Sequence, residues 1–179
     1  MESDSQTLTH SQPPVPYDIC EEKVEEVVNY TLSILGLQDW LVSTSFVSES
    51  EIKELNKEYR SKDHPTDVLS FPQEIFDDPV TVKKPLLEQA KTDEHAPPKV
   101  LGDIVICVAI ADQNAQKIGQ SLDKEIAFLI VHSVLHLCGH DHKNQSEEDI
   151  MLESQRTIIA KMEDDEPPPV WNNCVRSST

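Results

Sequence analysis

The segment His132-Ser-Val-Leu-His136-Leu-Cys-Gly139-His-Asp-His142 contains three histidines at spacings that suit a metal ion. Residues four positions apart share one face of a helix, so His132 and His136 can bind one ion together. Gly139 can end that helix, because glycine readily adopts the left-handed backbone of a C-terminal cap. The chain then turns back, and His142 can supply a third nitrogen. Three imidazoles without a fourth protein ligand predict a catalytic zinc site, since such sites keep one position open.

The helix that carries the first two histidines is apolar on every side. Residues 126–132 read Ile-Ala-Phe-Leu-Ile-Val-His, which predicts a buried helix. The alternative to metal binding is that these are core histidines whose rings bond to backbone carbonyls. Two unpaired imidazoles on a buried helix would be costly, and a shared ion removes that cost. Cys138 lies on the far side of the helix from His136, so we expect it to pack rather than to bind metal.

The chemistry of such an ion depends on the residues around it. The histidine spacing matches that of metzincin proteases, in which a glutamate follows the first histidine and acts as the general base. Ser133 occupies that position here and cannot accept a proton at neutral pH. A metal ion that acts without this base suits a phosphodiester substrate, because the ion can bind the anionic phosphate oxygens. An arginine can then stabilise the negative charge that grows in the transition state. Of the arginines Arg60, Arg156 and Arg176, we predict Arg60 in this role; the alternative is a surface ion pair with an acidic neighbour.

The composition describes an acidic chain of 179 residues with a formal net charge of −18. This length fits one domain, and the charge argues against a broad basic groove for nucleic acid. A bound zinc ion would nevertheless make its own pocket locally positive. The four cysteines form no CxxC pair, and neither a secretory signal nor a membrane span is recognisable. We therefore expect free thiols and a cytoplasmic location.

Hydrophobic periodicity and turn residues predict an α+β domain, in which a small mixed β-sheet packs with about five helices. Helices are expected at about 20–35, from a capping box at Ser48 to Arg60, at 109–118, from Ser121 through the histidines, and at 146–162. Strands are expected at 40–47, 66–72 and 101–108. The single domain is predicted to span 17–163 and to include a long loop at 73–99. Disordered segments are expected at 1–16 and 164–179.

Four segments of the chain together resemble the YbeY family. They are Leu55-Asn-Lys-Glu-Tyr-Arg60, Thr66-Asp-Val-Leu-Ser-Phe-Pro72, Leu101-Gly-Asp-Ile-Val-Ile and the histidine segment, and they cover roughly residues 40–145 in the family's order. The resemblance implies a fold like a pared-down zincin, with helices around a small mixed sheet. It also implies a single-strand-specific endoribonuclease that matures ribosomal RNA, notably the 3′ end of the small-subunit RNA, and takes part in ribosome quality control.

The resemblance also implies roles for individual residues. It implies that His132, His136 and His142 bind one Zn²⁺ ion and that Arg60 is the catalytic partner. The implied partners are single-stranded ribosomal RNA and the ribosome or small-subunit proteins, with no membrane and no DNA. Where many family members have tyrosine this chain has His140, which we expect to point to solvent or to stack on RNA.

Other residues of these segments have more than one interpretation. Asp141 could orient a histidine ligand, whereas local capping accounts for Asp67 and Asp103 equally well. Tyr59 and Phe71 could stack on unpaired bases, although core packing is the commoner use of such residues. Two rival functions also stay open. One is a zinc peptidase-like hydrolase, and the other is a non-enzymatic ribosome assembly factor with structural zinc.

Overall fold

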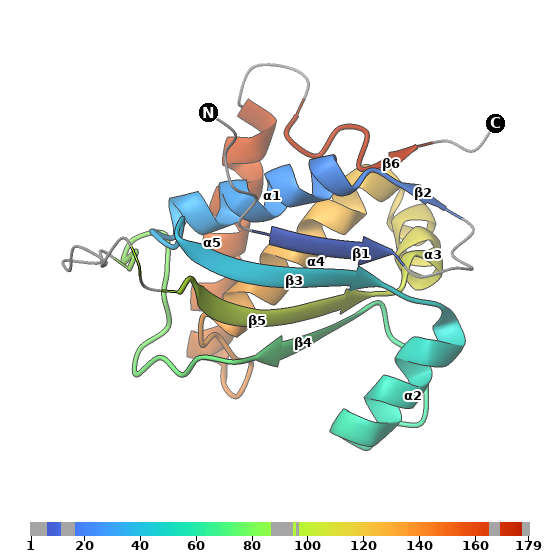
Figure 1. Ribbon diagram of the computed structural model, residues 1–179, viewed down its shortest axis with the longest axis horizontal. Coiled ribbons are helices and arrows are strands. Elements are labelled where there is room, and N and C mark those ends of the chain that lie inside the picture. The colour runs from blue at the N-terminus through green and yellow to red at the C-terminus, as the bar shows by residue number, and fades with distance from the viewer. Residues whose placement is uncertain (1–6, 12–16, 87–94, 96, 165–168, 177–179) are drawn as a thin grey trace.

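The computed structural model describes residues 7–11, 17–86, 95, 97–164 and 169–176 (Figure 1). Within them the helices are α1 (Glu21–Ile34), α2 (Glu49–Arg60), α3 (Val108–Ile118), α4 (Leu122–Leu137) and α5 (Gln145–Asp164). The strands are β1 (Thr7–Ser11), β2 (Asp18–Ile19), β3 (Trp40–Phe46), β4 (Val68–Pro72), β5 (Lys99–Ile106) and β6 (Val175–Arg176). The predicted α+β class, with five helices and a small mixed sheet, is confirmed.

Helix starts follow the capping residues read from the sequence. The Ser48 hydroxyl accepts a hydrogen bond from the backbone of Glu51, whose carboxylate accepts one from the Ser48 N–H, and α2 begins directly afterwards. The Ser121 hydroxyl accepts from the Lys124 N–H at the start of α4. No helix within the described ranges is long and apolar enough to cross a membrane.

The sheet is mixed, with the strand order β1-β3-β5-β4. Strands β1, β3 and β5 run parallel to one another, and β4 pairs antiparallel with β5 at one edge. One face carries Val42, Phe46 and Ile104 into the main core with α1, α4 and α5. In Figure 1, α4 and α5 lie behind the sheet, and α2 extends beyond the β4 edge. The sheet therefore holds α4 close to the edge strand β4.

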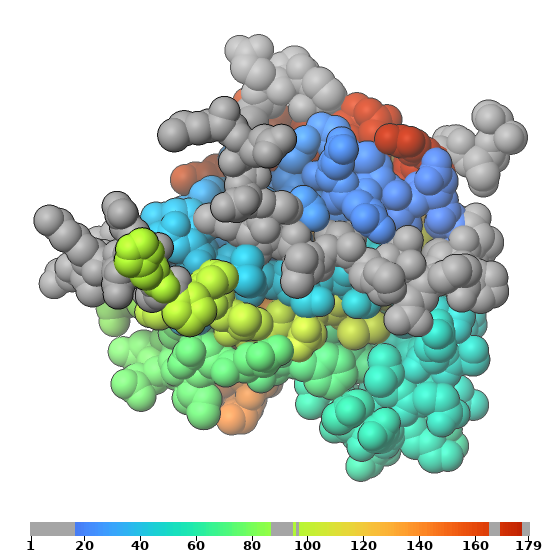
Figure 2. All heavy atoms as spheres, viewed as in Figure 1, coloured from blue at the N-terminus to red at the C-terminus, as the bar shows by residue number. Residues whose placement is uncertain are grey.

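A smaller apolar cluster attaches α2 to the other face of the sheet. Ile52 of α2 packs there with Leu69 of β4 and with Cys107, and Phe71 adds to the cluster. In the same orientation as Figure 1, the spheres of α2 form the lower corner of the molecule beside the residues around β4 (Figure 2). This packing places Arg60, the last residue of α2, at the β4 edge.

Parts of both segments that were expected to be disordered have regular or packed structure, whereas residues 1–6, 12–16, 165–168 and 177–179 of these segments lie outside the described residues. Residues 7–11 form β1, which pairs with β3 from Thr7 opposite Val42 to Ser11 opposite Phe46. Residues 175–176 pair with β2, and Trp171 and Cys174 before them are buried. The sequence did not reveal these strands because both are short and are stabilised by pairing with a strand distant in sequence.

The long segment between β4 and β5 contains neither helix nor strand in its described residues, 73–86, 95 and 97–98. Val80 fixes this segment to the end of α4, because its N–H donates to the Cys138 carbonyl at 3.1 Å. Val80 is also 4% exposed and belongs to the main core. Residues 73–86 are thus anchored directly beside the histidine segment.

Gly102 lets β5 pass close to both β4 and α4. Its φ is 155°, and a Cβ atom there would overlap the Phe71 carbonyl oxygen and lie 2.8 Å from Leu137 Cδ2. We expect Gly102→Ala to destabilise the protein by about 3 kcal/mol, through overpacking and backbone strain. Urea unfolding measures this change.

Gly119→Ala is the matched control for this prediction. Gly119 ends α3 with a φ of 72°, and a Cβ atom there would meet nothing within 4 Å. Only backbone strain then opposes the substitution, at about 1 kcal/mol. Equal losses of unfolding free energy in the two variants would contradict the close packing of β5 against α4.

Candidate metal centre and phosphate-binding cavity

Three histidine side chains converge at the C-terminal half of α4. The Nε2 atom of His136 lies 3.1 Å from the Nε2 of His132 and 3.1 Å from the Nε2 of His142. Two nitrogens that bind one tetrahedral zinc ion at its usual bond length are about 3.3 Å apart. The structure therefore brings together the three histidines that the sequence selected, at a spacing that fits a single ion.

The turn after α4 brings the third histidine back to the first two. Gly139 has a φ of 93°, its N–H donates to the His136 carbonyl, and the next N–H, of His140, donates to the Leu135 carbonyl. These two bonds form a Schellman motif, which requires a left-handed residue at this position. The chain reverses there, so His142 faces the helix it has just left.

Hydrogen bonds fix which ring nitrogens of His132 and His136 carry protons. The His136 Nδ1–H donates to the His140 carbonyl at 3.0 Å, and a carbonyl can only accept. The His132 Nδ1–H donates to Oε1 of Gln155 on α5 at 3.3 Å. Both Nε2 atoms therefore present lone pairs toward each other. Two facing lone pairs repel unless a cation lies between them, so this donor set fits a metal ion.

The environment also keeps these rings uncharged. Burial first, and the nearby His132 second, lower the pKa of His136 to about 4. Burial likewise lowers the pKa of His132, although the bond to Gln155 opposes this shift. Both imidazoles are thus neutral at physiological pH, which is the form that binds a metal.

His140 does not point to solvent, contrary to the expectation from the sequence. Its side chain is 4% exposed, and its Nε2–H donates to the Val80 carbonyl at 2.7 Å. The buried ring connects residues 73–86 to the turn, while the backbone carbonyl of the same residue orients His136. His140 is therefore a structural support of the histidine cluster.

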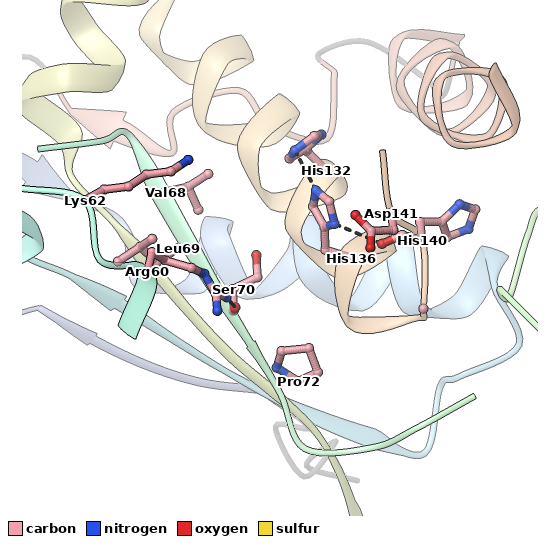
Figure 3. A pocket seen from close by; sticks show the side chains of 11 residues that line it. Arg60, Lys62, Val68, Leu69, Ser70, Pro72, His132, His136, His140 and Asp141 are labelled. Carbon is pink, nitrogen blue, oxygen red and sulfur yellow. Dashed lines mark hydrogen bonds between the residues drawn. The ribbon is translucent and has the colours of Figure 1, made fainter. Parts of the chain in front are cut away.

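A cavity of about 680 Å³ opens between α4 and the edge strand β4. Figure 3 shows its two sides, with Arg60, Ser70 and Pro72 facing His132 and His136. Its remaining lining comes from Lys62, Val68, Leu69, Gly139, His140 and Asp141. The cavity thus joins the histidine cluster to the arginine that the sequence selected.

Arg60 is held in place by neutral partners. Its Nη2–H donates to the Ser70 carbonyl at 2.7 Å, and its guanidinium lies 5.6 Å from the centre of the Phe71 ring. Tyr59 packs edge-on against the same ring at 5.1 Å. No carboxylate of the described residues pairs with Arg60, contrary to the surface ion-pair alternative. Its remaining N–H donors have no partner among the described residues and can bind an anion.

The three aspartates of these segments have hydrogen-bond partners other than the histidine rings. Asp67 accepts a hydrogen bond from Asn114, and Asp103 accepts one from Gln73. Asp141 accepts from the backbone N–H of His142 at 2.7 Å, and this bond lowers the pKa of its carboxyl. Asp67 and Asp103 thus bond to side chains 47 and 30 residues away, which local capping does not explain, and among the residues that the structure describes none of the three aspartates bonds to a histidine ring.

Two residues close to the histidine cluster, Ser133 and Cys138, have buried side chains and are not candidate metal ligands. Ser133 is fully buried, and its hydroxyl has no hydrogen-bond partner in the described part of the chain. Cys138 is also fully buried, and burial alone raises the pKa of its thiol well above the usual range. Cys138 is therefore a packing residue, as expected.

Gln155 is the residue that the sequence did not reveal. It is 2% exposed on α5, and its Oε1 is the acceptor that orients His132. A glutamine in a helix twenty-three residues away carries no spacing signal, because only tertiary packing of α5 on α4 brings it to the ring. The hydrogen-bond acceptors that orient His132 and His136 thus come from α5 and from the turn after α4.

We expect Gln155→Leu to weaken the affinity for a divalent ion by about tenfold to a hundredfold, the usual cost of losing a hydrogen bond to a ligand histidine. The substitution keeps the side-chain volume and removes an Nε2 that has no partner among the described residues, so the fold should be retained. Competition with a fluorescent chelator measures the affinity. Gln145→Leu, on the exposed start of the same helix, should leave it unchanged.

Comparisons with known proteins give relatives of similar length. The chain is 40% identical over 143 residues to "Endoribonuclease YbeY" of Thermoanaerobacter sp. (strain X514), covering 79% of this chain and 87% of the relative. It is 38% identical over 154 residues to the protein of the same name from Halalkalibacterium halodurans, covering 86% and 87%. The Aquifex aeolicus (strain VF5) protein, with the same name, is 39% identical over 143 residues and covers 79% and 83%.

A family model and a solved structure agree with these relatives. The solution structure of TM1509 from Thermotoga maritima has a similar fold, with a TM-score of 0.51, at 24% identity over 90% of this chain and 97% of that chain. The family model described as "Endoribonuclease YbeY" matches residues 7–163, which include β1 and the whole histidine cluster. The chain therefore belongs to the YbeY endoribonuclease family.

Proposed function

We propose that the protein is a Zn²⁺-dependent endoribonuclease that cleaves single-stranded RNA, with ribosomal RNA of the small subunit as its substrate. The observation that carries the proposal is the cavity that joins His132 and His136 of the three-histidine cluster to Arg60, an arginine with no carboxylate partner among the described residues. Membership of the YbeY family supports an RNA substrate.

His132, His136 and His142 would hold the ion through their Nε2 atoms, because two of these atoms carry outward lone pairs and the third lies beside them. A zinc ion bound there supplies Lewis-acid chemistry to a phosphodiester in the cavity. His132 is oriented by Gln155, and His136 is oriented by the His140 carbonyl. They can therefore bind the ion without rearranging, which favours catalysis.

Arg60 binds the phosphate in this proposal. The guanidinium has five N–H donors, and the bond to the Ser70 carbonyl uses one of them. Contact with the Phe71 ring fixes its plane before a substrate arrives. A positioned guanidinium stabilises the negative charge that grows on the phosphoryl oxygens, at little reorganisation cost.

The proton-accepting groups of the site favour a phosphodiester over a peptide. Ser133, at the position of the metzincin base, is buried and cannot reach the cavity. Asp141 is the acidic residue in the cavity lining, and its lowered pKa makes it a weak base. A peptidase mechanism that depends on a carboxylate base is therefore poorly supported, whereas charge stabilisation by Arg60 is available.

The surroundings support further parts of the proposal. An unpaired RNA backbone can bend into a cavity between a helix and a strand edge, where a duplex cannot enter. The free cysteines Cys20, Cys107, Cys138 and Cys174 support a reducing compartment such as the cytoplasm. The acidic surface, with a formal net charge of −18, favours basic partners such as ribosomal proteins.

The first test compares wild type with Arg60→Ala and His136→Ala on a single-stranded RNA. We expect Arg60→Ala to lower kcat/KM by about a hundredfold to a thousandfold, because it removes the main stabiliser of the developing charge. His136→Ala should abolish cleavage together with zinc binding. Gel analysis of a labelled oligonucleotide measures the rates.

Arg156→Ala is the control, because it removes an exposed arginine on α5, outside the cavity lining, and should cleave at the wild-type rate. It also reports contaminating nuclease, which would give equal rates in all four preparations. Equal rates, or no cleavage by zinc-loaded wild type, would refute an intrinsic nuclease activity.

The second test removes the metal and separates a catalytic from a structural zinc. We expect the chelated protein to keep its helical circular dichroism and cooperative unfolding, because the main core forms without the histidines. Zinc at a hundred times its Kd should raise the unfolding free energy by about 2.7 kcal/mol. An unfolded metal-free protein would instead support the assembly factor with structural zinc.

A further inference from the structure

Phe128 is an exposed aromatic residue on a helix that is otherwise buried. Its side chain is 40% exposed, whereas its neighbours Ala127 and Leu129 are 0% and 3% exposed. The face of α4 that carries Phe128 continues to His132 and His136, which are partly buried at the cavity. An exposed aromatic ring beside a polar site offers a flat apolar face to a ligand bound there.

The Phe128 ring has the orientation of a stacking platform next to the metal candidate position. It lies one turn before His132, with the two ring centres 6.3 Å apart and their planes 10° from parallel. A base attached to a phosphate held between the histidines and Arg60 is therefore within reach of this ring. Stacking on aromatic rings is a common way in which proteins bind unpaired bases.

Lys62 adds a positive charge to the cavity. Figure 3 shows its side chain beside Val68, across from His132. No carboxylate pairs with Lys62 in the described ranges, although the chain has a formal net charge of −18. An unpaired lysine at a cavity wall suits a second phosphate of the same strand.

The opposite side of the cavity has different chemistry. Asp141 lies on the far side of His136 from Lys62 in Figure 3, and its carboxylate pairs with Lys143 at 3.3 Å. The charges of Asp141 and Lys143 offset each other, whereas Lys62 has no carboxylate partner among the described residues, so the Lys62 side is the more favourable one for a phosphate. A strand bound at the histidines can therefore extend toward Lys62 in one direction and along the face of α4 toward Phe128.

We infer that Phe128 and Lys62 form a nucleotide subsite, in which Phe128 stacks on an unpaired base and Lys62 binds a flanking phosphate of the same RNA strand. This inference rests on the proposed function and specifies how that site selects its substrate. A base can cover Phe128 only when it is free of a complementary strand. The subsite thus gives the chain a physical basis for preferring single-stranded RNA.

Binding is tested with zinc-loaded Arg60→Ala protein, so that cleavage does not obscure the measurement. Fluorescence anisotropy gives the Kd for a labelled single-stranded RNA heptamer, alone and with one abasic residue at each position in turn. We expect the additional substitution Phe128→Leu to raise the Kd about tenfold to a hundredfold, as the loss of one stacked base predicts. Phe128→Trp should restore tight binding.

The abasic series separates stacking from a structural role. We expect one abasic position at which Phe128→Leu causes no further loss, because the base that stacks is already absent. Lys62→Gln should weaken binding to every oligonucleotide by the same factor. It should also reduce the slope of log affinity against log salt concentration by about the amount expected for one phosphate contact. Ile150→Ala, which removes an exposed apolar side chain from α5, should leave the Kd unchanged.

Several results would overturn the subsite. An unchanged Kd in Phe128→Leu, or an equal loss at every abasic position, would contradict base stacking. If Phe128→Leu weakened the binding of an unstructured protein but not the binding of RNA, the result would indicate that a peptide binds at this surface. If wild type binds RNA through Phe128 without cleaving it, the nuclease proposal fails and the nucleotide subsite remains. If wild type cleaves RNA and the Phe128 substitutions change neither binding nor cleavage, the nucleotide subsite fails and the nuclease proposal remains.

Discussion

The facing lone pairs of His132 and His136 are the constraint on which this site depends. Each ring uses its Nδ1–H on an acceptor fixed by the fold, so the two Nε2 atoms have no proton to share across 3.1 Å. Burial opposes protonation of both rings, which leaves a metal cation as the favourable partner. The acceptors come from α5 and from the Schellman turn. The packing of α5 on α4 and the turn therefore together determine which ring nitrogens of His132 and His136 carry protons.

The acidic composition of the chain does not conflict with an anionic substrate. The negative charge is spread over many surface carboxylates, and several of them pair with lysines, as Lys83 does with Glu153 and Lys23 with Glu26. Arg60 and Lys62, by contrast, line the cavity without a carboxylate partner in the described residues. Local charges within a few ångströms outweigh a distant surface that salt screens. The net charge instead affects which proteins approach the molecule.

The sequence predicted the histidine cluster and Arg60 because their signals are local. Spacing along one helix, a glycine at the turn and a capping box at Ser48 each depend on neighbours within a few residues. Gln155 and the buried ring of His140 could not be predicted in this way, since α5 packing and contact with Val80 determine their roles. Strand β1 was missed for the same reason, because it is stabilised by pairing with β3, more than thirty residues away.

The edge of β4 distinguishes an RNA substrate from a peptide. An extended peptide binds such an edge by adding a strand, which requires free backbone carbonyls along it. Arg60 already donates to the Ser70 carbonyl in the middle of β4, and its position is reinforced by Phe71. A peptide strand that paired with this carbonyl would have to displace the hydrogen bond from Arg60. A phosphate can bind the remaining guanidinium donors without breaking it, so the arrangement of α2 against β4 itself favours a phosphodiester.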